Sequence, residues 1–79
     1  MPTEVFIARH VHDQLLEHFP DLIQEIFIEN PEPSYRVDDS SRYGWQLAGV
    51  SVTMSPSLYD SYVHALSRLV SKLSTLRNV

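Results

Sequence analysis

The sequence contains no cysteine and only two glycines among its 79 residues. Without cysteine the chain cannot form disulfide bonds, thiolate nucleophiles or zinc sites built from thiolates. With only Gly44 and Gly49 available, a glycine-rich loop that cradles phosphate is also excluded. We therefore expect one small domain, residues 1–79, that depends on its apolar core and has a narrow margin of stability.

Long hydrophobic runs are also missing. No segment approaches the roughly 20 apolar residues that a membrane-spanning helix needs. The first ten residues, MPTEVFIARH, lack the basic n-region of a secretory signal peptide. These two absences predict a cytoplasmic protein without a membrane partner.

Basic residues are scarce in the first half of the chain. Residues 1–39 contain nine acidic and two basic side chains, a net charge of −7, and residues 40–79 contain one acidic and four basic side chains, a net charge of +3. Such an asymmetry suits attraction between two faces of one fold, self-association, or a binding surface of one sign. The overall charge of −4 makes nonspecific nucleic-acid binding unlikely, because such binding normally uses a clustered basic face.

The segment from residue 57 to residue 77 has the clearest periodicity. Ser57 is followed three residues later by Asp60, which is the spacing of a capping box at a helix N-terminus. Lys72 and Arg77 fall in the last turns, where cations interact favourably with the helix dipole. One face of the helix is apolar and contains Leu58, Tyr62, Ala65, Leu66, Leu69, Leu73 and Leu76. We therefore predict a long amphipathic C-terminal helix from Ser57 to Arg77.

This helix has more apolar surface than one face requires. Tyr59, Val63 and Val70 widen the apolar arc to roughly 160°. Burying each such side chain is worth about 1.5–3 kcal/mol, so exposing several of them would forfeit much of the stability of a small domain. The three residues are accordingly predicted to contact either other helices of the chain or a second copy.

The N-terminal segment is predicted to be helical from Glu4 to His18, because Ile7, Val11 and Leu15 follow one another at i, i+4 spacing. The segment includes His10, His12 and His18. On a helix, His10 and His12 point about 160° apart, so the three imidazoles cannot share a metal ion. We interpret them as partly exposed helix residues, with His18 nearest to the apolar face, and predict no metal and no cofactor.

Residues 20–28 begin with Pro20, which suits the first turn of a helix. Leu22, Ile23, Ile26 and Phe27 have helical spacing, but Ile26 and Ile28 equally fit the start of a strand. A short helix is the preferred interpretation, and a strand remains the alternative.

Residues 34–54 are rich in aromatic and β-branched residues. The segments SYRVD and YGWQLAGVSVTM are typical of two strands of a β-hairpin joined by the polar loop DSSR. Trp45 and Leu47 share one face of the second strand, whereas Val50, Val52 and Met54 share the other. This change of phase predicts a β-bulge at Gly49. The complete prediction is an α+β fold: N-terminal helix, short second helix, β-hairpin with a bulge and long C-terminal helix.

A two-stranded hairpin is marginally stable and has two free edges. Together with the wide apolar arc, this predicts a homodimer. The predicted contact residues for protein partners are the hairpin residues Arg42, Tyr43 and Trp45, since aromatic and arginine side chains favour binding hot spots, and the helix residues Tyr59, Val63 and Val70.

No nucleophile, metal or phosphate motif is recognisable, so we predict a protein that is not an enzyme and has no evident small-molecule substrate. The preferred function is a small regulator or inhibitor that binds itself and a larger protein. The alternative is a nucleic-acid-associated regulator that contacts phosphates through Arg68, Lys72 and Arg77 of the basic C-terminal helix.

Overall fold

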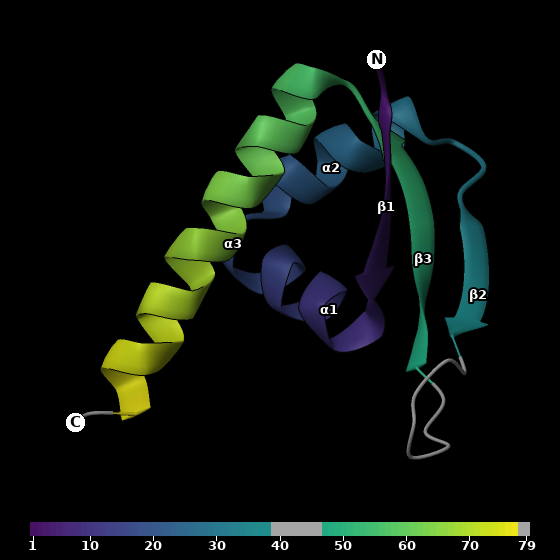
Figure 1. Cartoon of the computed structure of the whole chain (residues 1–79). Coiled ribbons are helices and arrows are strands. Elements are labelled where there is room, and N and C mark those ends of the chain that lie inside the picture. Colours follow the sequence, from purple (N-terminus) through teal and green to yellow (C-terminus); the bar gives the residue numbers. More distant parts are fainter. Residues whose placement is uncertain (39–46, 78–79) are drawn as a thin grey trace.

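The computed structural model describes residues 1–38 and 47–77, and these residues form an α+β fold of two layers (Figure 1). The elements in chain order are β1 (Thr3–Ala8), α1 (Arg9–His18), α2 (Pro20–Glu29), β2 (Ser34–Asp38), β3 (Leu47–Met54) and α3 (Pro56–Arg77). The three strands form one layer and the three helices cover one face of it.

The sheet is antiparallel, with strand order β1-β3-β2, so β3 lies at its centre. Val50, Val52 and Met54 of β3 are buried and face the helices, since a strand presents alternate residues to each face. Their partners on β1 are Ile7, Val5 and Thr3, which share this inner face. The expected hairpin pairing of Ser34–Asp38 with residues 47–51 is confirmed.

The N-terminal helix is shorter than the sequence predicts, because residues 3–8 form β1 and α1 begins only at Arg9. The i, i+4 spacing of Ile7, Val11 and Leu15 misled the prediction, because Ile7 reaches the core from a strand. In the strand, Val5 and Ile7 share the inner face, but Val5, Phe6 and Ile7 are all apolar, so no alternation of apolar and polar residues marks the strand in the sequence. β1 also pairs with the free edge of β3. The hairpin therefore has one unpaired edge fewer than expected, which weakens the argument for a homodimer from unpaired edges.

The predicted bulge at Gly49 is wrong. Gly49 faces Ala8 on one side and Arg36 on the other, and the register continues without interruption through both neighbours of β3. A Cβ at Gly49 would lie 2.5 Å from the carbonyl oxygen of Ile7 and 2.5 Å from Cζ of Phe6. Glycine is required here because the β1 backbone and the Phe6 ring approach β3 closely.

Residues 20–28, for which the sequence allows a helix or a strand, are helical. Pro20 occupies the first turn of α2 and Asp21 lies in that turn, where a carboxylate is favourable. Ile23 and Ile26 enter the core.

α3 begins one residue earlier than predicted, and the side chain that caps it is Ser55 rather than Ser57. The Oγ of Ser55 accepts a hydrogen bond from the backbone N–H of Leu58 at 3.3 Å. Pro56 then occupies the first helical position, for which its missing N–H is no loss.

A single apolar core joins β1, α1, α2, β3 and α3, whereas residues 34–37 of β2 are all exposed. Its buried members are Ile7, Leu15, Ile23, Ile26, Val50, Val52, Met54, Leu58, Tyr62, Ala65 and Leu69. No helix in the described part of the chain has the length and apolar character needed to cross a bilayer.

Candidate protein-binding surface

The second apolar face of α3 is exposed. We call it the α3 seam and define it by Tyr59, Val63, Leu66, Val70 and Leu73, which follow one another at spacings of four, three, four and three residues. Relative exposures are 38% for Tyr59, 44% for Val63, 63% for Val70 and 40% for Leu73, while Leu66 is partly buried. The three helix residues predicted to contact partners thus lie on one continuous stripe.

The seam is exposed because α3 uses a different stripe to hold the fold together. Leu58, Tyr62, Ala65 and Leu69 face the core, and residues 70–75 after Leu69 are all exposed. Beyond it, α3 continues past α1 and away from the sheet (Figure 1). Leu73, which the sequence assigns to the main apolar face, is therefore exposed. The sequence reveals both stripes, but it does not show the residue at which α3 extends beyond the packed core.

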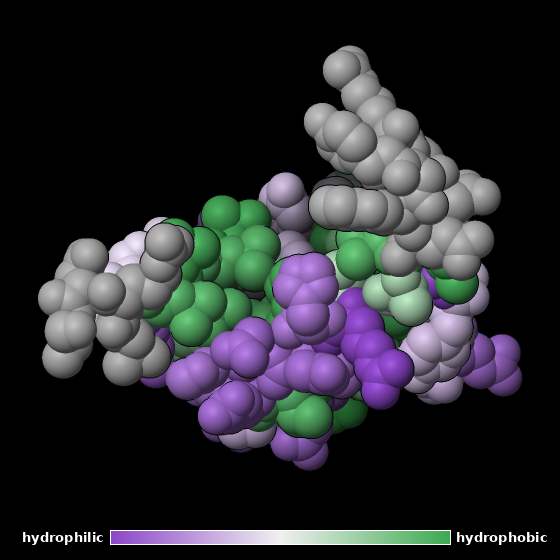
Figure 2. Space-filling view, turned by 90° about the horizontal axis from the view of Figure 1, so that it is seen from below, coloured by the Kyte–Doolittle hydropathy of each residue, from purple (hydrophilic) through white to green (hydrophobic). Residues whose placement is uncertain are grey.

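The charged side chains of α3 lie outside the seam. Figure 2 shows a group of apolar side chains beside the grey C-terminal residues and a band of hydrophilic side chains across the middle of this face. Arg68 and Lys72 lie on another side of α3, where each cation sits over the ring of Phe19, at 5.6 Å and 5.2 Å from its centroid. This cation–π contact holds both basic residues at the α1–α2 junction.

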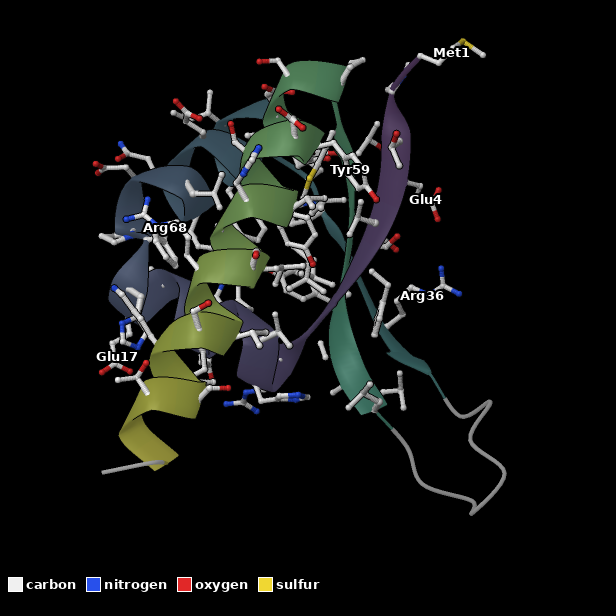
Figure 3. The ribbon with its side chains drawn as sticks, turned by 60° about the vertical axis from the view of Figure 1, so that its left-hand side comes forward. Met1, Glu4, Glu17, Arg36, Tyr59 and Arg68 are labelled. Carbon is white, nitrogen blue, oxygen red and sulfur yellow. The ribbon has the colours of Figure 1, made fainter. Side chains whose placement is uncertain are left out.

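At its N-terminal end the seam approaches β1. Tyr59 projects from α3 toward β1, whereas Glu4 projects from the opposite face of that strand (Figure 3). The ring centroid of Tyr59 lies 6.4 Å from that of Tyr62, which belongs to the core. Burial, and secondarily the neighbouring Tyr59, raise the pKa of the Tyr62 hydroxyl above its usual value, so this hydroxyl stays protonated at neutral pH.

A second apolar surface lies over β2. An open groove of about 510 Å³ separates the inner face of β2 and β3 from the helices. Tyr35 and Val37 of β2 line it and are exposed, because no helix covers this end of the sheet. The opposite wall includes Phe27 and His12.

The histidines gather into no site. His12 is the only one that lines the groove, where its Nδ1 lies 3.2 Å from the carboxylate of Asp13 and its ring packs edge-on against Phe27. In the described part of the chain, no three histidine, aspartate or glutamate side chains come together in a way that could hold a metal ion. His18 is half-buried beside Phe19, in keeping with its expected place near the apolar face.

The hairpin residues Arg42, Tyr43 and Trp45 lie outside the described residues, so their predicted role in binding stays a prediction.

No protein-family model, no curated protein and no solved structure matches the chain.

Proposed function

We propose that this chain is a small, non-enzymatic regulator or inhibitor that acts by binding protein, and that it works as a homodimer. The observation that carries this proposal is the exposed α3 seam. Contiguous apolar stripes that are left open on a folded domain typically mark interaction sites. A helix with two adjacent apolar stripes can hold its own fold with one and a partner with the other.

The spacing of the seam suits pairing with another α-helix. Alternating steps of four and three residues are the heptad pattern of helices that pack side by side. Val63 and Val70 then occupy the a positions, and Leu66 and Leu73 occupy d positions. β-branched residues at a with leucine at d favour two-stranded assemblies, which supports a dimer over higher oligomers.

The charge distribution supports a second copy as the occupant. The acidic residues of α1 and α2 lie on elements other than the seam: Asp13, Glu17, Asp21, Glu25 and Glu29. The seam itself contains no ionisable carboxylate or cation. Two copies that each carry a net charge of −4 can therefore meet there with the least repulsion. For the larger protein that the dimer would regulate, Arg42, Tyr43 and Trp45 remain the predicted contacts.

The alternative of nucleic-acid binding through α3 gains no support. Two of the three cations that it would use, Arg68 and Lys72, are exposed, but both lie over the single ring of Phe19 at the α1–α2 junction. The acidic helices α1 and α2 adjoin them and would repel phosphate.

The proposal is tested by placing a charge on the seam. In Val70→Asp a carboxylate replaces an exposed apolar side chain of the seam, and we expect the sedimentation coefficient to fall from that of a dimer to that of a monomer. Ser71→Asp is the matched control, since Ser71 is the adjacent exposed residue outside the seam. Equal sedimentation of wild type and both variants would refute a role for the seam in self-association.

A further inference from the structure

The seam alone is too small for a stable dimer. Its five residues compare with the roughly 20–30 residues that each partner contributes to a standard interface of about 800 Å² per side. A dimer built on the seam therefore needs a second contact area that adjoins it. A candidate for this second area is β1, toward which Tyr59 projects (Figure 3).

β1 is an edge strand with one side of its backbone unpaired, since it pairs only with β3 within the described residues. Exposed edges are normally protected by charged side chains, proline or a covering element. Within Thr3–Ala8 the only charged residue is Glu4, and α3 packs mainly on α1, α2 and β3. β2, the other edge, is shorter, carries the exposed Arg36 and directly follows Pro33. β1 is the less protected edge.

We propose, as an inference that rests on the proposed function, that the β1 edges of two copies pair antiparallel about Val5. This pairing joins the two sheets into one sheet of six strands. β1 and α3 both run away from the end of the molecule at which the N-terminus lies (Figure 1). A two-fold axis beside β1 therefore sets the two β1 strands antiparallel and also sets the two α3 seams antiparallel on the same side of the joined sheet.

The register follows from the faces of β1 and from its charge. Residues opposite each other in an antiparallel pair share a sheet face, so inner-face residues must meet inner-face residues. Pairing about Val5 places Val5 opposite its own copy and Thr3 opposite Ile7 of the other strand. Glu4 then faces Phe6, whereas a shift that placed Glu4 opposite Glu4 would set like charges against each other.

The test uses single cysteines, because the natural chain has none. In Val5→Cys the two thiols would face each other across a Cα separation of about 4.5–5.5 Å, which a disulfide can bridge. We expect rapid formation of a covalent dimer under mild oxidation. The control is Glu4→Cys, which is more exposed but would have Cα atoms about 8 Å apart, beyond the reach of a disulfide. Tyr35→Cys tests the β2 edge in the same way.

A distance measurement keeps the proposal testable if Val5→Cys folds poorly. Nitroxide labels on Glu4→Cys should report a short separation. Labels on Tyr35→Cys should be much farther apart, because five strand spacings, about 24 Å, separate the two β2 strands. Faster cross-linking of Tyr35→Cys than of Val5→Cys, or a short Tyr35 distance, would overturn the β1 pairing. If the chain sediments as a dimer and Val5→Cys still fails to cross-link, the β1 pairing is wrong while the proposed function stands; a monomeric chain contradicts both.

Discussion

At the scale of single residues, two adjacent positions of β3, Ala48 and Gly49, differ in the side chains that they can accommodate. Gly49 lies under the Phe6 ring and beside the Ile7 carbonyl, so any side chain there would collide with β1. The neighbouring residue Ala48 is exposed and has room for a larger side chain. These two adjacent positions therefore have opposite tolerance to substitution.

We predict that Gly49→Val destabilises the fold by several kcal/mol, because the Cβ contact with the Ile7 carbonyl can be relieved only by a shift of the β1 backbone. Ala48→Val should change the free energy of unfolding by about 0.5 kcal/mol or less, as expected for an exposed strand position. Urea unfolding of both variants measures the difference. Equal losses would contradict the close approach of β1.

The side chain of Asn30 forms hydrogen bonds to the backbone of β3, which the sequence around it does not predict. β2 begins at Ser34 opposite Ser51, so Thr53 lies beyond the end of β2 and has no partner there. The Asn30 side chain takes that place: Nδ2 donates to the carbonyl oxygen of Thr53 at 2.9 Å, and Oδ1 accepts from its N–H at 2.9 Å. Nδ2 also donates to the carbonyl oxygen of Ile26 at 2.9 Å, which ties the end of α2 to β3.

Asn30→Asp should therefore lower the free energy of unfolding by about 1–3 kcal/mol, since the carboxylate cannot donate to the two carbonyl oxygens. Glu29→Gln is the matched control, because it changes the charge of the preceding residue, whose side chain is exposed. The melting temperatures of the two variants give the comparison. An Asn30→Asp protein as stable as the wild type would show that these hydrogen bonds contribute nothing.

At the scale of secondary-structure elements, α3 is the most informative. Its helical character and its two apolar stripes follow from the spacing of its residues, and both are present in the structure. Its exact start does not follow from the sequence, because Ser55 and Ser57 are both plausible caps and only the path of the chain out of β3 decides between them.

Ser55→Ala should cost about 1 kcal/mol of stability, the usual loss when a serine cap is removed. Ser57→Ala should cost close to nothing, because Ser57 lies in the exposed first turn and caps no N–H in the structure. Thermal unfolding followed by circular dichroism distinguishes the two. A larger loss of stability in Ser57→Ala than in Ser55→Ala would instead support a capping box formed by Ser57 and Asp60.

β1 shows where reasoning from sequence fails at this scale. Its six residues are too few for a clear period of two, and Ile7 coincides with the helical spacing of α1. What identifies β1 as a strand is the long-range pairing with β3, nearly fifty residues later, which no local pattern contains. The exposure of Leu73 is missed for a related reason, since only the packed body shows how far α3 extends beyond it.

At the scale of the whole molecule, two free surfaces adjoin each other: the α3 seam and the edge of β1. Residues 1–38 and 47–77 of a single chain cover neither surface, although their core is continuous and they have no buried polar side-chain atom without a partner. The fold is thus complete as a unit, and the exposed seam is a surface left over from folding. This is the physical basis for our proposal that the protein acts by binding.

Sedimentation equilibrium of the unmodified chain over a range of concentrations tests this account most directly. We predict a mass equal to two chains at micromolar concentrations, with dissociation to one chain only on strong dilution. A mass of one chain at every concentration up to the millimolar range would contradict the claim that a second copy covers the seam.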